Sequence, residues 1–146
     1  MVWREQANER LRATGRRSGA ARAAVVDLLA GESCCLSAQE LHARLGTEGA
    51  TVGVASVYRA LDQLAGLGLV QRVDVGDGIA RYERVQAEDH HHHVVCDDCG
   101  RVEPFADESL ERAISQATGR LGYDVSGHEI VLRGACADCR PGGLTG

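Results

Sequence analysis

The residues best suited to chemistry in this sequence are four cysteines that stand in two C-x-x-C pairs. They are Cys96, Cys99, Cys136 and Cys139. A two-residue spacer lets both thiolates of a pair bind one ion, and two pairs supply the four sulfur ligands of a tetrahedral zinc site. Four thiolates leave no open coordination position, so the pattern predicts a structural zinc ion. Two disulfides and a redox-active C-x-x-C are the competing interpretations, and a reducing cytosol together with the pairing of the motifs disfavours them.

A run of four histidines, His90 to His93, leads directly into the apolar segment 94–96. We predict a strand here, and successive side chains on a strand point to opposite faces. His90 and His92 would then belong to one metal site, and His91 and His93 to another. A solvated polar loop is the alternative, because His-rich tracts favour metal binding without requiring it.

Each histidine pair needs further ligands from other segments. Glu111 and His128 are the candidates for the pair His90 and His92. Glu83 and Cys35 are the candidates for the other pair, and a metal ion held there would join the two halves of the chain. Taken singly, Cys35 has an equally good interpretation as an ordinary buried residue, and Glu83 as a solvated charge.

The charge distribution divides the chain into two unlike halves. Its 146 residues include 16 arginines, no lysine and 21 acidic residues, for a formal charge of −5. Residues 1–72 hold 9 arginines against 7 acidic residues, whereas residues 73–146 hold 7 against 14. The total argues against a nucleic-acid partner, but the positive first half does not. No apolar run approaches the ~18 residues of a membrane span and the N-terminus lacks an apolar signal core, so we expect a cytoplasmic protein with no membrane partner.

Three short helices and a hairpin are expected in the first half. Apolar residues recur at helical spacing over 21–29, Ser37 and Glu40 form a capping box that starts a second helix, and a third helix fits residues 54–66. Leu69–Val75 and Ile79–Val85 flank a Gly-Asp-Gly turn, as in a β-hairpin. This order of elements predicts a winged helix-turn-helix domain over residues 1–85.

A short hinge loop is expected at 86–89, followed by a small α/β domain over 90–146. Its expected elements are strands at His90–Cys96 and Arg101–Phe105, a helix from an Asp107 cap to about residue 121, and a strand at Glu129–Arg133. The residues of this helix expected to face the core are Leu110, Ile114, Ala117 and Leu121. The fold class is therefore α+β.

The third helix carries the residues best placed to read DNA. A recognition helix presents its N-terminal residues to base edges, and here these include Ser56, Tyr58 and Arg59. Arg16 and Arg17, in the basic N-terminal segment, would reach the phosphate backbone or a narrow minor groove. The alternative is that Tyr58 packs in the core and the arginines are merely solvated, but the helix-turn-helix order favours a DNA interface.

Together these motifs resemble the ferric uptake regulator (Fur) family of metal-sensing bacterial repressors. The motifs are Gly53-Val-Ala-Ser-Val-Tyr-Arg-Ala-Leu61, the histidine run into Cys96-x-x-Cys99-Gly100, His128 and Cys136-x-x-Cys139. The resemblance covers about residues 8–140. It implies a homodimer with an N-terminal winged helix and a C-terminal dimerisation domain. It further implies that metal occupancy closes the dimer on AT-rich palindromic operators of metal uptake genes.

Carried over by position, the resemblance assigns three metal sites and a DNA-binding segment. The structural zinc site takes Cys96, Cys99, Cys136 and Cys139; the site within the dimerisation domain takes His90, His92, Glu111 and His128; the interdomain regulatory site takes Cys35, Glu83, His91 and His93. Arg22 remains from the family's basic segment, although Gly19 and Ala21 replace the usual residues beside it.

The identity of the sensed metal is the point on which the sequence departs from the family pattern. Iron-sensing members carry His where Cys35 stands, and the Asp and Cys of certain zinc sensors would fall near Gln71 and Val85. The four-His run and the thiolate favour the zinc uptake regulator (Zur) branch and regulatory Zn²⁺, whereas the oxygen of Glu83 leaves Fe²⁺ or Mn²⁺ open. Pro104 stands where peroxide-sensing members have an acidic ligand, which disfavours that class.

A metal-dependent hydrolase is the alternative from another class of protein. It would need an open coordination position for an activated water and a nearby base. Each cluster here already offers four ligands, and the sequence has no H-E-x-x-H motif. We therefore expect a DNA-binding repressor rather than an enzyme, with no small-molecule substrate.

Overall fold

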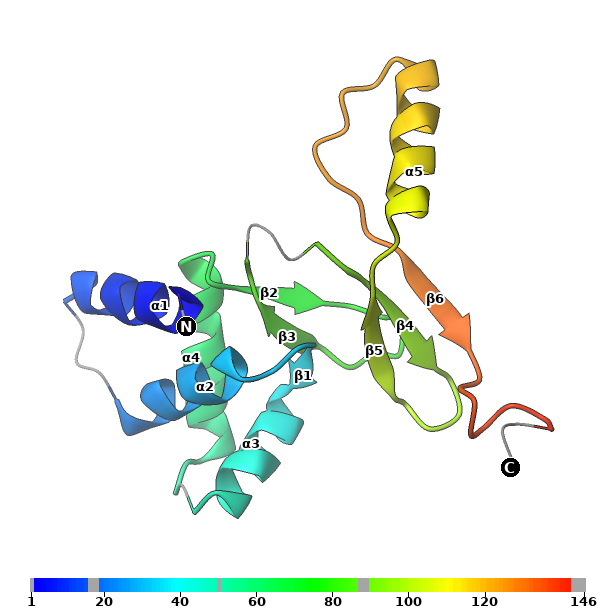
Figure 1. The fold of residues 1–146 in the computed structure, drawn as a ribbon. Coiled ribbons are helices and arrows are strands. Elements are labelled where there is room, and N and C mark those ends of the chain that lie inside the picture. Colours follow the sequence, from blue (N-terminus) through cyan, green and yellow to red (C-terminus); the bar gives the residue numbers. More distant parts are fainter. Residues whose placement is uncertain (1, 16–18, 50, 87–89, 143–146) are drawn as a thin grey trace. The chain divides into compact units, whose positions relative to one another are not determined.

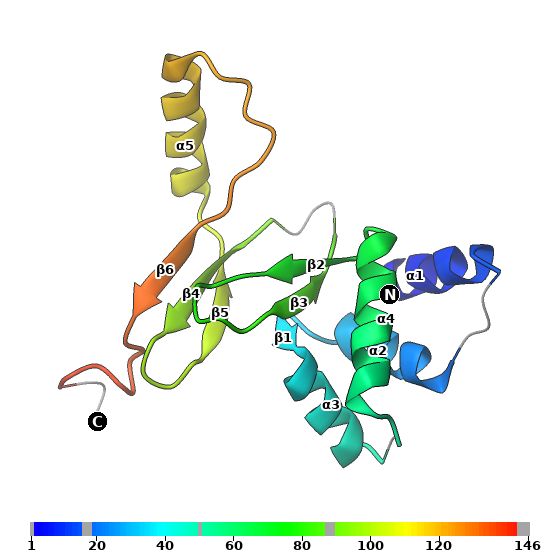
Figure 2. The ribbon, with the colours of Figure 1, turned by 180° about the vertical axis from the view of Figure 1, so that it is seen from behind.

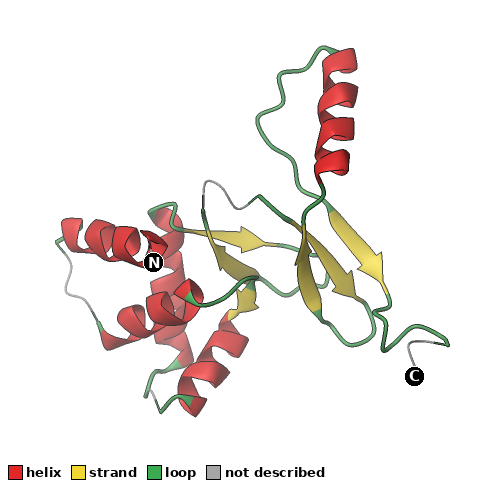
Figure 3. Ribbon diagram, viewed as in Figure 1, coloured by secondary structure: helices red, strands yellow, loops and turns green. Residues whose placement is uncertain are grey.

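The computed structural model describes residues 2–15, 19–49, 51–86 and 90–142. The chain forms two compact units, Met1–Asp89 and His90–Gly146, which we call the N-terminal unit and the C-terminal unit. Both contain helices and strands, so the α+β class is confirmed (Figure 3). Of the hinge loop predicted at 86–89, residues 87–89 lie outside the described part of the chain. Within the described residues, no helix has the length and apolar character needed to span a bilayer.

Four helices build the core of the N-terminal unit (Figure 1). They are α1 (Val2–Ala13), α2 (Ala20–Ala30), α3 (Ala38–Thr47) and α4 (Val54–Gly66). The predicted helices correspond to α2, α3 and α4, and their apolar stripes meet around the fully buried Leu29, Leu41 and Leu61. The capping box of α3 is confirmed, because Ser37 Oγ accepts from the Glu40 N–H at 3.1 Å and Glu40 Oε1 accepts from the Ser37 N–H at 3.2 Å.

Helix α1 was not predicted. Its many polar residues hid an apolar stripe of Trp3, Ala7 and Leu11, which repeat every four residues and are buried in the same core. Trp3 also donates its indole N–H to the carbonyl oxygen of Leu69 at 3.0 Å, which fastens α1 to the segment that follows α4.

A three-stranded antiparallel sheet completes the winged helix. The strands β1 (Leu36–Ser37), β2 (Val70–Val73) and β3 (Arg81–Arg84) lie in the order β1-β3-β2 (Figure 2). The predicted hairpin is confirmed, with Val70 paired to Arg84 and Val73 to Arg81. Gly76 and Gly78, on either side of Asp77, adopt positive φ angles of 84° and 80°, which is why the turn uses glycine.

The C-terminal unit is a second three-stranded sheet with one helix. Its elements are β4 (His92–Cys96), β5 (Val102–Phe105), α5 (Glu108–Leu121) and β6 (Val131–Gly134). The central strand β4 pairs antiparallel with β5 and parallel with β6. The Asp107 cap of α5 is confirmed, since its carboxylate accepts from the Leu110 N–H at 3.0 Å.

The prediction that one face of α5 packs in a core is wrong. Leu110, Ile114 and Ala117 are only half-buried, Leu121 is 71% exposed, and no residue of α5 is fully buried. The helix extends beyond its sheet rather than lying across it (Figures 1 and 2). The periodicity indicated correctly that α5 is amphipathic, but it could not reveal that the chain alone leaves the apolar face partly uncovered.

Candidate metal centres and nucleic-acid interface

The structure brings the four cysteines of the two C-x-x-C pairs together. Cys96 ends β4 and Cys136 closely follows β6, and these strands are parallel neighbours with Cys96 paired to Gly134. Both pairs therefore leave the sheet at the same end, although 36 residues separate them in sequence. The four Sγ atoms all lie within 4.8 Å of one another. None of the six cysteines, which all lie in the described part of the chain, is in a disulfide. This arrangement fits a single tetrahedral ion.

Hydrogen bonds prepare the Cys96 sulfur to act as a thiolate. The backbone N–H groups of Cys99 and Cys136 donate to Cys96 Sγ at 3.5 and 3.3 Å, and they lower the pKa of this thiol to about 6. Side-chain hydrogen bonds with Cys136 and Cys96 favour the protonated form of Cys139 and raise the pKa of its thiol to about 12. A soft divalent cation can bind such a group of thiols by displacing the protons of their hydrogen bonds.

One acidic residue of each C-x-x-C turn forms an ion pair with an arginine. Asp97 forms an ion pair with Arg133 of β6, and Asp138 forms one with Arg101 at 3.2 Å. The first pair joins its turn to β6, and the second joins its turn to the residue that precedes β5. Such contacts restrict the two turns that carry the cysteines.

The second cluster comprises His90, His92, Glu111 and His128. One ligand atom from each lies within 4.8 Å of the others. Glu111 is at the centre, because its Oε1 lies 2.6 Å from His92 Nε2 and its Oε2 lies 2.7 Å from His128 Nε2. The hydrogen bond with His92 is the main reason that the pKa of Glu111 is lowered, so this carboxyl group is ionised at neutral pH. Three imidazoles and a carboxylate are donors that suit Zn²⁺, Fe²⁺ or Mn²⁺.

Three different elements bring these ligands together. His90 precedes β4 and His92 lies on it, Glu111 is in the first turn of α5, and His128 is in the loop before β6. The predicted alternation along the strand is visible in the rings. His90 and His92 have centroids 4.8 Å apart, whereas His91 pairs with His93 at 4.9 Å.

Each of the two units contains two of the four residues predicted for the third site. In the N-terminal unit Glu83 lies on β3, is 3% exposed, and accepts from Gln71 Nε2 at 2.7 Å across the hairpin. The sequence prediction named Cys35, yet the sulfur within 4.8 Å of the Glu83 carboxylate is that of the adjacent Cys34. Cys35 is buried, and its hydrogen bond with Cys34 together with burial raises its pKa far above the usual range. In the sequence, the only indication that Cys34 is a candidate ligand is its position next to Cys35.

The predicted DNA-reading residues lie on α4. Arg59 is exposed and donates from Nη2 to Ser56 Oγ at 2.9 Å, and Tyr58 is 38% exposed with its hydroxyl accepting from Gln39 Nε2 at 2.9 Å. Both side chains are therefore at the surface and held by a polar neighbour. Arg16 and Arg17 lie outside the described residues.

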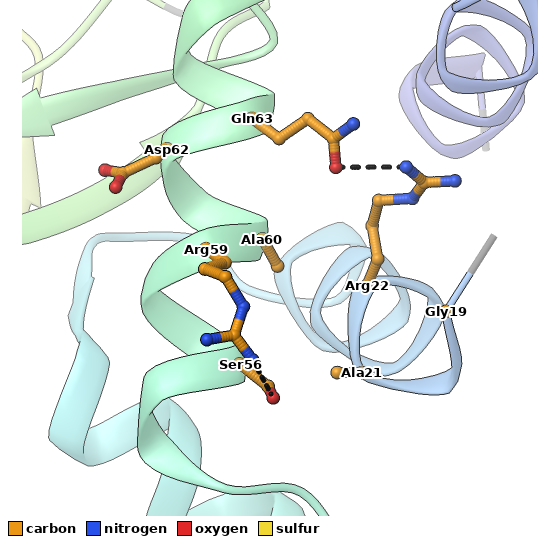
Figure 4. Close-up of a pocket in the computed structure, with 8 residues that line it drawn as sticks. All are labelled: Gly19, Ala21, Arg22, Ser56, Arg59, Ala60, Asp62 and Gln63. Carbon is orange, nitrogen blue, oxygen red and sulfur yellow. Dashed lines mark hydrogen bonds between the residues drawn. The ribbon is translucent and has the colours of Figure 1, made fainter. Parts of the chain in front are cut away.

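A groove of about 600 Å³ runs between α2 and α4 (Figure 4). The residues that line it are Gly19, Ala21, Arg22, Ser56, Arg59, Ala60, Asp62 and Gln63. Unlike the exposed Arg59, Arg22 is only 7% exposed. Its Nη1 donates a hydrogen bond to Gln63 Oε1 at 3.0 Å. Neither the burial of Arg22 nor the role of Gln63 was foreseen from the sequence.

A winged helix with polar side chains exposed on its fourth helix, joined to a unit with clustered metal ligands, defines a metal-dependent DNA-binding regulator. The sequence matches the Ferric uptake regulator family over residues 13–133, and the chain belongs to that family. Members of this family are transcription regulators and not enzymes, so the hydrolase interpretation is excluded.

Among its relatives are the ferric uptake regulation proteins of Klebsiella pneumoniae and of Escherichia coli K12. The first is 38% identical over 107 residues, which cover 72% of this chain and 68% of that protein. The second is 37% identical over 107 residues, which cover 72% of each.

Solved structures of the family share the fold. The ferric uptake regulator of Vibrio cholerae is 31% identical with a TM-score of 0.78, and the match covers 88% of this chain and 98% of that one. That of Helicobacter pylori, described as having three functional metal-binding sites, is 26% identical with a TM-score of 0.81 and 93% coverage of both chains. A zinc-bound manganese uptake regulator is 26% identical with a TM-score of 0.77, covering 93% and 99%.

Proposed function

We propose that this member of the Fur family is a zinc-responsive repressor that binds AT-rich palindromic operators as a metal-loaded homodimer and controls metal uptake genes. The observation that carries the proposal is the cluster of His90, His92, Glu111 and His128, whose ligand atoms converge within 4.8 Å. A bacterial regulator that binds chromosomal DNA works in the cytoplasm, so we propose a cytoplasmic location for this protein.

We assign the four C-x-x-C cysteines to structural zinc and the other two ligand sets to regulatory metal. Within the regulatory sets, Cys34 and Glu83 would supply one half of a site and His91 and His93 the other half. We propose Cys34 in place of Cys35 as the thiolate ligand, because the Cys34 sulfur lies within 4.8 Å of the Glu83 carboxylate, whereas Cys35 is buried. A thiolate among imidazoles favours Zn²⁺ over Fe²⁺ and Mn²⁺.

A homodimer is supported by the apolar residues that the single chain leaves uncovered. Helix α5 has an apolar face without a core, and Leu121, Tyr123 and Leu132 of the same unit are exposed. Exposed apolar residues of this kind are typical of a subunit interface. Two copies related by a two-fold axis would present two α4 helices to a palindromic operator.

Metal-dependent operator binding tests the proposed function. We expect the zinc-loaded protein to bind a duplex selected from random DNA at least about 100-fold more tightly than protein stripped of regulatory zinc, a difference of about 2.7 kcal/mol. Fluorescence anisotropy at fixed salt would measure both affinities, with the structural zinc retained in each sample. Equal affinity in the two states would refute metal control, and a larger response to Fe²⁺ or Mn²⁺ at buffered free concentration would refute zinc specificity.

Cys34 and Cys35 provide a matched pair for the thiolate ligand. We expect Cys34→Ser to raise the free zinc needed for half-maximal operator binding by about ten-fold or more, since a hydroxyl is a poor zinc ligand. Cys35→Ser should leave the zinc response within about three-fold and lower the melting temperature slightly, because the side chain is buried. If Cys35→Ser alone changes the zinc response, the ligand is Cys35 and our assignment is wrong.

A further inference from the structure

Arg22 is a buried cation beside α4, the helix that we propose reads DNA. It lies on α2 near its N-terminus with 7% of its surface exposed, whereas Arg59 on α4 is exposed. A buried guanidinium group is costly unless its N–H groups are hydrogen bonded. The role of Arg22 therefore depends on what its guanidinium contacts.

The partner of Arg22 is Gln63. Arg22 Nη1 donates to Gln63 Oε1 at 3.0 Å, and this contact joins the start of α2 to α4 (Figure 4). Gln63 follows Arg59 by four residues and Ser56 by seven, so all three lie on one face of the helix. The same three residues line the groove of about 600 Å³. Arg22 thus holds the face of α4 that presents Arg59.

No carboxylate among the described residues forms an ion pair with Arg22. Asp62 lines the same groove, and on its other side Arg22 borders a second groove together with Glu5, Glu9 and Arg12. The amide of Gln63 fixes the direction of the guanidinium without neutralising it. Because the head group is planar and carries donors at fixed angles, even one acceptor restricts the directions in which it can point.

We infer that Arg22 is a positioning residue, which sets α4 against α2 through Gln63 and so determines how Arg59 and Ser56 meet DNA, rather than a direct ligand of phosphate. This inference rests on the proposed DNA-binding function. In this inference Gln63 also has a role. It affects specificity through the position of α4 and not through a contact with a base.

Gln63→Met tests the contact while it keeps the charge of Arg22 and the size of residue 63. We expect the ratio of operator affinity to scrambled-duplex affinity to fall about ten-fold, equivalent to about 1.4 kcal/mol. Arg22→Met and the double variant should show the same loss, because each removes the same interaction. Gln63→Glu keeps an acceptor and should keep the wild-type ratio, since any repulsion from DNA affects both duplexes alike.

The salt dependence of binding separates positioning from direct phosphate contact. Gln63→Met should leave the slope of log affinity against log salt unchanged, whereas Arg59→Met should reduce its magnitude by about one. Circular dichroism melts would check that each variant is folded. If Gln63→Met does not fold, Gln63→Glu can still be measured. A reduced slope for Arg22→Met in both Gln63 backgrounds, or a wild-type ratio for Gln63→Met, overturns the inference. Failure of the wild-type protein to bind any operator would instead refute the proposed function.

Discussion

Replacing Cys96 by serine is expected to unfold the C-terminal unit and leave the N-terminal unit folded. Among the described residues of 90–142 only His92, His93, Val95 and Cys96 are buried. So small a core supplies little stability, and small domains commonly compensate with a structural metal. Apparent binding free energies of structural zinc are about 10–16 kcal/mol, which exceeds anything that this core can supply.

The substitution should act on zinc binding before it acts on packing. Serine keeps the size of the side chain but is a poor zinc ligand, and Cys96 is the sulfur toward which the Cys99 and Cys136 N–H groups point. We expect the variant to lose one zinc ion per chain and to lose protection of residues 90–142 in hydrogen exchange. Among the described residues, the core of the N-terminal unit is formed by α1 to α4 and the segment up to Tyr82, so its protection should persist.

Cys35→Ser is the matched control for this experiment, because Cys35 is not one of our proposed metal ligands. It makes the same chemical change in the N-terminal unit, outside the cysteine quartet, and should leave the C-terminal unit protected. If Cys96→Ser retains its zinc and its protection pattern, the quartet is not a structural zinc site. If both variants unfold the same unit, loss of a thiol in general and not of this ligand is responsible.

Local chemistry explains which parts of the fold were predictable. The Ser37 and Glu40 capping box, the Gly-Asp-Gly turn and the apolar stripe of α4 all depend on residues close in sequence, and each predicted element is present. Helix α1 was missed because one buried residue per turn, among polar neighbours, is a weak signal. The packing of α5 was predicted wrongly, because periodicity shows that a face is apolar but not what covers it.

The same distinction applies to the candidate sites. Ligand spacing and strand alternation were sufficient to group the cysteine quartet and the cluster of His90, His92, Glu111 and His128. Spacing and alternation could not distinguish Cys34 from Cys35 as a candidate ligand. The two residues are adjacent, and only the local backbone conformation decides which sulfur lies near Glu83. Spacing and alternation also could not show that Arg22 contacts Gln63, a pair 41 residues apart whose meeting depends on how α2 packs against α4.

Replacing Glu111 by glutamine is expected to weaken metal binding at the histidine cluster by at least about 100-fold, the upper end of what even indirect ligand partners contribute. Glu111 is the only carboxylate of the cluster, and its two oxygens reach His92 Nε2 at 2.6 Å and His128 Nε2 at 2.7 Å. Glutamine keeps the shape and one oxygen acceptor but removes the negative charge that a divalent cation requires.

Glu108→Gln is the matched control, because Glu108 is an exposed residue in the same first turn of α5. The two substitutions change the charge near the helix N-terminus equally, so any general electrostatic effect should be common to both. Competition with a chromophoric chelator, on protein whose structural zinc is retained, would measure metal affinity. Operator binding by Glu111→Gln should then require correspondingly more free metal. Equal metal affinities of the two variants would show that Glu111 is not a ligand and that the carboxylate serves only to bind and orient His92 and His128.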